Sequence, residues 1–265
     1  FQFTPYAYQK SQTGQHRSLY GDKLKKVKFW TGEDLQKGDI FESDVPLETR
    51  VLIDQYADSN EPSVGHRELF FDIEVEVVDG FPEPKTAKNK ITAIAIYDKV
   101  ADKYSCYVLG DVPNTDVVES FRSEEELLQR FYQKYLEINP TILSGWNIDG
   151  FDIPYLYNRT ERVMGRQMAN CLSPIGSVYY NEHQNKYKIA GVSQLDYLAL
   201  YKLYTYTQQS SYRLDFIGQL EVGIGKIEYE GTLDDLYRND INKYVEYNLN
   251  DVVIVKALDD KLKFI

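Results

Sequence analysis

One strand with two unlike faces limits the folds open to this chain more than any other feature. Residues 68–78 alternate in polarity as a β-strand does. Large apolar residues would form one face: Leu69, Phe71, Ile73, Val75 and Val77. The other face would carry Asp72 and Glu74 beside Phe70 and Glu76. In an α/β sheet both faces are covered, and two buried carboxylates are costly without compensation.

Divalent cations would remove that cost. Asp72 and Glu74 stand two residues apart, so both carboxylates project from the same face of the strand. Carboxylate oxygens are ligands that Mg²⁺ favours. An edge strand with a solvated acidic face is the simpler explanation of this pair taken alone, because D-x-E is a common spacing in a chain with 41 acidic residues.

The neighbouring segments predict an α/β sandwich, in which helices flank a mixed sheet. Ser123 begins a capping box that opens one helix, and Pro154 suits the first turn of another. A last helix is expected over 241–262, with a core side of apolar residues: Ile241, Val245, Leu249, Val252 and Val255. Five further strands are expected, the last two as a hairpin: 91–97, 104–109, 141–144, 178–180 and 187–189.

The chain is predicted to divide into a small appended domain, residues 1–65, and a main domain, residues 66–265. In the first, residues 23–29 alternate like a half-exposed strand, and residues 46–56 have the apolar spacing of a helix. The polar stretch 57–63 indicates a linker between the two.

Composition and charge exclude several classes of protein. No apolar run approaches the ~18–20 residues that span a bilayer. Cys106 and Cys171 lie far apart in the sequence, which argues against a disulfide framework or a zinc site and fits a cytoplasmic protein. The net charge of −11 has the wrong sign for holding nucleic acid by bulk electrostatics. The chain opens at Phe1 without a Met or a signal peptide, and we expect it to be a fragment.

Two later groups of polar residues are ambiguous when each is taken singly. Asp152 precedes Pro154 and is most simply the N-cap of the expected helix, although the strand before it would bring this loop to a sheet edge, where α/β sites gather. Tyr247 and Asp251 are four residues apart and share one face of the last helix, where they could orient a water or a phosphate oxygen. In a chain with 23 tyrosines, this spacing also arises by chance.

The order of these groups is specific. D-x-E on the first core strand, N-x-x-x-F-D after a later strand and Y-x-x-x-D on the last helix resemble the three exonuclease motifs of the family B DNA polymerases. The flanking residues resemble the T-even-phage type: FFDIEV at 70–75, DGFPEP at 79–84, GWN at 145–147, FDIPY at 151–155 and YNLNDV at 247–252. The resemblance covers residues 66–265 and is looser over 1–65, which would be part of the family's N-terminal domain.

The resemblance implies a ribonuclease H-like fold and a 3′→5′ proofreading exonuclease that hydrolyses the 3′-terminal phosphodiester of DNA. Two Mg²⁺ or Mn²⁺ ions would be held by four acids: Asp72, Glu74, Asp152 and Asp251. Two such ions ~3.5–4 Å apart can activate a water and stabilise the leaving 3′-oxygen. Tyr247 would hydrogen-bond the attacking water or the scissile phosphate, and the charge of Lys226 could offset charge developing on that phosphate.

The resemblance also implies how DNA would be held. Phe151 and Asn147 would border the primer end, Phe151 by stacking or wedging against a base. The hairpin around 178–189 would help to separate primer from template. The substrate would be a single-stranded DNA 3′ end or a primer terminus, with no membrane involved. Nearby acids outside the motifs are expected to be helix caps and surface residues: Asp149, Asp196 and Asp215.

The family's polymerase palm would follow the third motif, but the chain stops at Ile265. The missing polymerase domains would carry much of the DNA-binding surface, which would account for the acidic charge. We expect the fragment to be monomeric and, if phage-encoded, to lie in the host cytoplasm.

Two other functions stay open. One is a catalytically idle module for DNA binding or scaffolding, which the presence of all four acids and Tyr247 disfavours. The other is a stand-alone ribonuclease of the same superfamily, which the N-terminal segment and the phage-type flanks disfavour.

Overall fold

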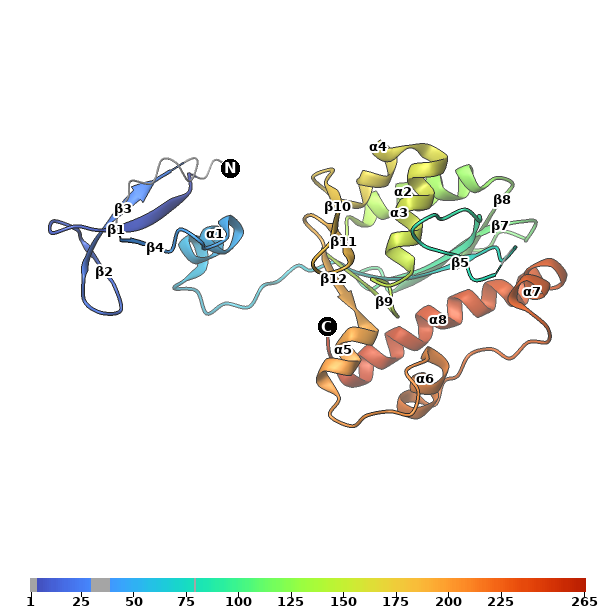
Figure 1. The fold of residues 1–265 in the computed structure, drawn as a ribbon. Coiled ribbons are helices and arrows are strands. Elements are labelled where there is room, and N and C mark those ends of the chain that lie inside the picture. The colour runs from blue at the N-terminus through green and yellow to red at the C-terminus, as the bar shows by residue number, and fades with distance from the viewer. Residues whose placement is uncertain (1–3, 30–38, 79) are drawn as a thin grey trace. The chain divides into compact units, whose positions relative to one another are not determined.

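The computed structural model describes residues 4–29, 39–78 and 80–265; Phe1 and Asp79, which figure in the sequence analysis, lie outside these ranges. The chain forms two compact units, Phe1–Val64 and Gly65–Ile265 (Figure 1). None of the helices in the described ranges is both long and apolar enough to cross a membrane.

The described residues of the smaller unit form an antiparallel sheet and the helix α1. The strands lie in the order β2-β3-β1-β4, and the predicted strand and helix of this unit correspond to β3 and α1. The guanidinium of Arg50 on α1 lies 4.5 Å from the centre of the Tyr6 ring on β1 and pairs with Glu42 at 2.6 Å, which ties the helix to the sheet. The elements are β1 (Tyr6–Lys10), β2 (His16–Arg17), β3 (Lys23–Lys28), β4 (Ile40–Phe41) and α1 (Leu47–Tyr56).

The larger unit is built on a six-stranded mixed sheet in the order β12-β9-β5-β6-β7-β8. The strand with two unlike faces, β5, lies between β9 and β6, so it is an interior strand and not a wet edge. It ends at Val75, three residues earlier than predicted. The strands are β5 (Glu68–Val75), β6 (Ile91–Asp98), β7 (Lys103–Leu109), β8 (Val118–Phe121), β9 (Ile142–Gly145) and β12 (Ser193–Asp196), with a separate hairpin of β10 (Val178–Asn181) and β11 (Lys186–Ile189).

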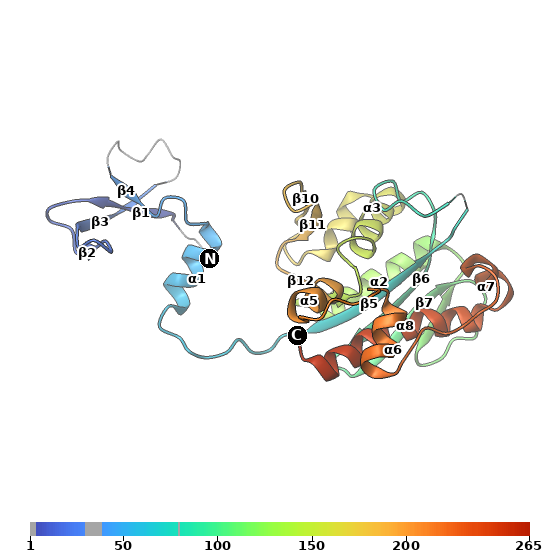
Figure 2. The same cartoon turned by 60° about the horizontal axis from the view of Figure 1, so that its bottom comes forward.

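Helices cover both faces of this sheet, which confirms the predicted α/β fold. In Figure 1, α2, α3 and α4 lie on one side and α6, α7 and α8 on the other, and Figure 2 shows α3 and α8 on opposite sides of the sheet from a second direction. The apolar residues of β5 pack on the α2 and α3 side, whereas Phe70 packs with α8. The helices are α2 (Glu124–Ile138), α3 (Asp152–Met164), α4 (Arg166–Ala169), the 3₁₀ turn η2 (Asn170–Leu172), α5 (Tyr197–Tyr204), α6 (Leu214–Val222), α7 (Leu233–Asn239) and α8 (Ile241–Leu262).

Local signals in the sequence predicted where α2 begins and where α8 begins and ends. The capping box at Ser123 forms with Glu126, and α8 has its predicted bounds. Helix α3 begins at Asp152 and not at Pro154; proline is tolerated there because the first N–H groups of a helix lack intrahelical partners. The expected core side of α8 is correct at Val245, Val252 and Val255, while Ile241 and Leu249 are only half-buried.

The pairing between β5 and its neighbour β9 ends partway along β5. Strand β9 pairs in parallel with β5 only as far as Phe70 opposite Ser144, and the chain then turns away after Gly145. A Cβ atom on Gly145 would lie 2.6 Å from Cγ2 of Ile148 and closer still to the carbonyl oxygen of Phe71. The missing side chain therefore allows the strand end to lie close to β5, where the following loop begins.

We expect Gly145→Ala to destabilise the protein by about 1–3 kcal/mol, because the contacts on Phe71 are with backbone and cannot relax easily. Urea unfolding curves would measure the change. Gly225→Ala is the matched control, since its new Cβ would meet only the end of the flexible Gln219 side chain, at 3.3 Å. Equal stability of Gly145→Ala and Gly225→Ala would contradict the close approach.

Candidate active site

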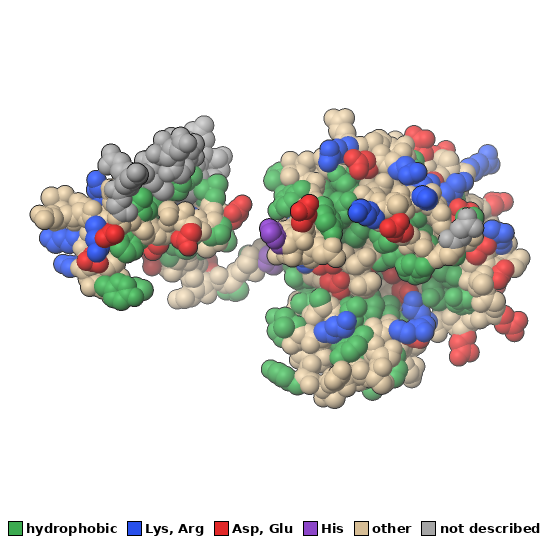
Figure 3. All heavy atoms as spheres, in the orientation of Figure 1, with side chains coloured by type: hydrophobic (Ala, Val, Ile, Leu, Met, Phe, Trp, Pro, Cys, Tyr) green, Lys and Arg blue, Asp and Glu red, His purple; other side chains and the backbone are tan. Residues whose placement is uncertain are grey.

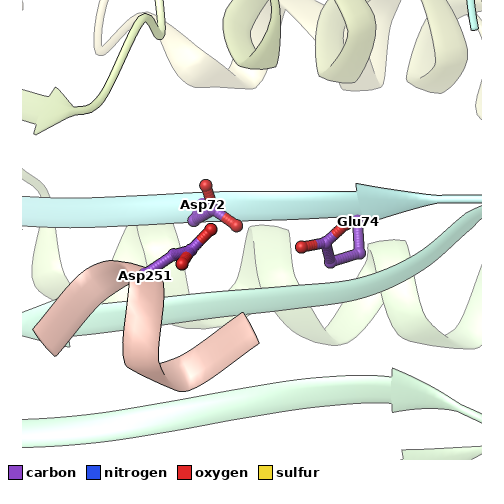
Figure 4. Close-up of side chains that lie close together, drawn as sticks. All are labelled: Asp72, Glu74 and Asp251. Carbon is purple, nitrogen blue, oxygen red and sulfur yellow. The ribbon is translucent and has the colours of Figure 1, made fainter. Parts of the chain in front are cut away.

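Three carboxylates converge between β5 and α8. One oxygen from each of Asp72, Glu74 and Asp251 lies within 4.8 Å of the others. Figure 4 shows Asp72 and Glu74 on the strand and Asp251 on the helix, with the carboxylates pointing toward one another. Three of the four predicted metal ligands are therefore together.

The packing of α8 brings Asp251 to this place. Val252 and Val255 of α8 are buried in one apolar cluster with Phe70 of β5. Asp251 adjoins Val252, so the contact that buries the apolar face of the helix also sets its carboxylate over the acidic residues of the strand. Asp251 is 4% exposed.

Asp152, the fourth predicted ligand, is bonded to the same strand. Its Oδ1 accepts a hydrogen bond from the backbone N–H of Ile73 at 3.1 Å, between Asp72 and Glu74. β9 no longer pairs with β5 at that point, so the Ile73 N–H can donate to a side chain. The simple N-cap interpretation was wrong: Phe151 is the N-cap residue, and Asp152 is the first residue of α3. Asp152 lies outside the set of three that meet within 4.8 Å.

Lys226 and Tyr247 border the three carboxylates. The Lys226 ammonium donates to the Tyr247 hydroxyl at 3.0 Å and forms an ion pair with Oδ2 of Asp251. The amide of Asn250 on α8 donates to the carbonyl of Gly225 at 3.0 Å, which holds the segment before Lys226 against the helix. The sequence assigned Lys226 to the site by the resemblance alone and Tyr247 also by its spacing from Asp251. In the structure, Lys226 contacts both Tyr247 and Asp251.

The two residues predicted to border a primer end lie in the loop before α3. Phe151 is half-buried and stacks on Tyr155, with ring centres 5.5 Å apart. Asn147 is exposed and has a φ of 63°, and its carbonyl accepts from the N–H groups of Gly150 and Phe151. Asn147 therefore shapes the turn that leads into α3.

Asp196 does more than the sequence predicted for it. It caps α5, as expected, but it is buried and not a surface residue. Its carboxylate also accepts from the N–H groups of Asn147 and Asp149, each at 3.1 Å, and so fixes the loop. Asp149 pairs with Lys186 of the hairpin at 2.7 Å. Asp215 is half-buried in the first turn of α6.

The sequence analysis missed Asn248. This fully buried side chain donates from Nδ2 to Oδ2 of Asp72 at 2.8 Å. It stands three residues before Asp251 and thus on the same face of α8. That spacing was visible in the YNLNDV motif, but an asparagine inside a helix carries no periodic signal that distinguishes it.

Burial raises the pKa values of the acids. It is the main cause for Glu74, whose pKa rises to about 8 with a further contribution from Asp251. Burial likewise raises the pKa of Asp152 to about 7, although the hydrogen bond from Ile73 acts in the opposite direction. The pKa of Asp72 lies well above its usual value because burial is reinforced by the neighbouring acids.

The same buried surroundings also shift the pKa values of Lys226, Asp251 and Tyr247. Burial acts to lower the pKa of Lys226, but the adjacent Asp251 and Tyr247 raise it overall, so the side chain stays an ammonium. Burial raises the pKa of Asp251, while Lys226 opposes the shift. Burial also raises the pKa of Tyr247, which keeps it a phenol at neutral pH.

The donor set fits a divalent cation. Among the described residues, Oδ1 of Asp251 is buried and has no hydrogen-bond partner, although leaving such a group unpaired is costly. A cation shared with Asp72 and Glu74 would satisfy it, and carboxylate oxygens are the ligands that Mg²⁺ and Mn²⁺ prefer. Acidic side chains are visible in a hollow of the larger unit in Figure 3.

Comparisons with known proteins identify the family of this chain. The family model described as DNA polymerase family B, exonuclease domain, matches residues 56–217. The chain belongs to the family B DNA polymerases. The matched residues carry Asp72, Glu74 and Asp152, while Asp251 and the residues around it lie beyond the match.

Individual relatives are DNA polymerases. The DNA-directed DNA polymerase of Escherichia phage RB69 is 34% identical over 229 residues, which are 74% of this chain and 25% of that protein. That of Enterobacteria phage T4 is 32% identical over 228 residues, 73% of this chain and 25% of the relative. A DNA polymerase of Pyrococcus glycovorans is 34% identical over 125 residues, 47% of this chain and 15% of the relative. The matched part of this exonuclease domain therefore spans a quarter of the two phage proteins.

We expect the metal-free protein to lose stability as the pH rises. The ordinary pKa values of Asp and Glu, 3.8 and 4.5, are raised to about 7 for Asp152 and about 8 for Glu74 in the folded state. The folded state then binds more protons than the unfolded state, so stability is fully present below pH ~4 and is lost as the pH rises through these values.

Melting temperatures in EDTA across this pH range would measure the loss. Glu74→Gln keeps the shape of the side chain and removes one of the titrating groups, so its melting temperature should fall less steeply with pH. An identical slope in the variant and the wild type would show that the cluster does not cause the effect.

Proposed function

We propose that this domain is a metal-dependent 3′→5′ exonuclease that proofreads DNA by removing the 3′-terminal nucleotide. The observation that carries the proposal is the meeting of Asp72, Glu74 and Asp251, with one buried oxygen left without a partner, in a chain of this family. Four interacting acids at an interior strand are destabilising in the absence of a cation, which favours a functional reason for them.

The same carboxylates would hold two Mg²⁺ or Mn²⁺ ions, with Asp152 as the fourth ligand. When bound, the ions would supply Lewis-acid polarisation of the phosphodiester and make a water more acidic. The bond from Ile73 uses Oδ1 of Asp152, so Oδ2 would be the atom that contacts an ion.

Tyr247 and Lys226 would act on the reacting phosphate. The Tyr247 hydroxyl keeps its proton at neutral pH and can donate it in a hydrogen bond to a phosphate oxygen or orient the attacking water. Lys226 keeps its charge and lies next to Asp251, where it would offset negative charge that develops on the phosphate.

The loop before α3 and the hairpin β10–β11 would hold the DNA. Phe151 has a supported ring that can stack on a base, and Asn147 is exposed beside it. The Asp149–Lys186 ion pair joins this loop to the hairpin, so the two would act as one surface. The remaining contacts would come from other domains of a longer polymerase, in keeping with the net charge of −11.

A time course on 5′-labelled single-stranded DNA tests the proposal. Digestion from the 3′ end gives a ladder of shortening labelled products in Mg²⁺ and no products in EDTA. Immediate release of a labelled mononucleotide, or activity that survives chelation, would refute the mechanism. A matched RNA strand tests for a ribonuclease, and intact strands under every metal condition would identify an idle binding module.

Removal of a metal ligand should abolish most of this activity. We expect Asp72→Ala and Asp251→Ala each to lower the rate roughly a thousandfold or more, because the ions and their ligands act as a unit. Single-turnover rates on labelled DNA would measure the loss. Asp260→Ala is the control on the same helix, since Asp260 is exposed and pairs with Lys256. A comparable loss in Asp260→Ala would show that the effect comes from the helix and not from the site.

Loss of the Tyr247 hydroxyl should have a smaller effect. Tyr247→Phe removes one hydrogen bond and keeps the four acids, so we expect the rate to fall on the order of ten- to a hundredfold. The same rate assay measures it, with Tyr237→Phe as the control, because that hydroxyl bonds the carbonyl of Leu109 at 2.6 Å instead. A loss as large as that of Asp72→Ala would contradict the proposed role of the phenol.

A further inference from the structure

Both polar atoms of the Asn248 side chain, Nδ2 and Oδ1, make hydrogen bonds. Nδ2 donates to Oδ2 of Asp72 at 2.8 Å and lies 3.4 Å from the carbonyl oxygen of the same residue. On the other side, the buried thiol of Cys106 on β7 donates to Oδ1 of Asn248 at 3.8 Å. Asn248 is fully buried, so water does not compete for these groups.

These contacts determine which way the amide points. The oxygen and nitrogen of an asparagine can exchange places unless its neighbours distinguish them. The backbone carbonyl of Asp72 can only accept, and the Cys106 thiol has a proton to donate, so Nδ2 faces Asp72 and Oδ1 faces the thiol. The three side chains form a short chain of hydrogen bonds from β7 through α8 to β5.

A hydrogen bond to one oxygen of Asp72 restricts rotation of the whole carboxylate. We infer that Asn248 is a positioning residue: it fixes the carboxylate of Asp72 in the orientation that holds a divalent cation. The inference rests on the proposed metal site and adds to it a residue that would not touch the ion. Because Asn248 and Asp251 lie on one face of α8, the helix supplies one ligand and the group that orients another.

The role differs from that of an ordinary buried amide. A residue that only stabilises the fold would leave the affinity for a cation unchanged in a folded variant. Partners that orient ligands of a metal typically change its affinity by about 10–100-fold when they are removed. Metal affinity, measured apart from activity, therefore distinguishes positioning from simple stabilisation.

The test is direct Mn²⁺ binding to the whole chain, with free Mn²⁺ measured by electron paramagnetic resonance. Asn248→Leu keeps a similar volume and removes the donor, and we expect it to weaken Mn²⁺ binding by about tenfold or more. Its exonuclease rate should fall at low Mn²⁺ and largely recover at saturating Mn²⁺. The control is Asn170→Leu, since that half-buried amide bonds Tyr157 and not a carboxylate.

Circular dichroism would establish that each variant is folded. Should the leucine be too bulky, Asn248→Ser leaves space instead, and its short hydroxyl cannot replace the bond to Asp72. A folded Asn248 variant that binds Mn²⁺ within about twofold of the wild type would overturn the inference, as would an equal loss in Asn170→Leu. A wild-type chain that binds no Mn²⁺ would instead overturn the proposed metal site, and the inference with it.

Discussion

The packing of α8 against β5 is the contact on which the site depends. Apolar burial of Val252 and Val255 with Phe70 drives the two elements together, and it brings Asp251 to Asp72 and Glu74 as a consequence. Hydrophobic burial is strong and non-directional, so it can impose a repulsive arrangement that the carboxylates would not adopt alone. Asn248 and Lys226 then act as local compensation, one by a hydrogen bond and the other by charge.

A different cause positions the fourth acid, Asp152: the end of the pairing between β9 and β5 near Gly145. Because β9 leaves β5 after Phe70, the Ile73 N–H needs another partner, and Asp152 provides it. The loop before Asp152 is held by Asp196, which accepts from the backbone of Asn147 and Asp149 and also caps α5. A backbone hydrogen-bond requirement therefore positions this carboxylate, whereas side-chain packing positions Asp251.

The sequence was sufficient to predict the features of the fold that have a local or periodic cause. The alternation of β5, the capping box at Ser123 and the bounds of α8 follow from such patterns, and the acidic motifs pointed to the family. Contacts between distant residues were not predictable in the same way. The bond from Ile73 to Asp152 spans 79 residues and that from Asn248 to Asp72 spans 176, and nothing local to either residue specifies its partner.

Charge balance favours the proposed pair of ions over a single ion. If fully ionised, the four acids and Lys226 together carry three negative charges. One divalent cation would leave the site negative, and a phosphodiester, which brings another negative charge, would still be repelled. Two cations would make it positive by one charge, which the scissile phosphate would neutralise. The raised pKa values of Glu74 and Asp152 belong to the metal-free state, in which bound protons would take the place of the proposed cations. Proton release on metal binding would then follow from the same four carboxylates that are proposed to bind the ions.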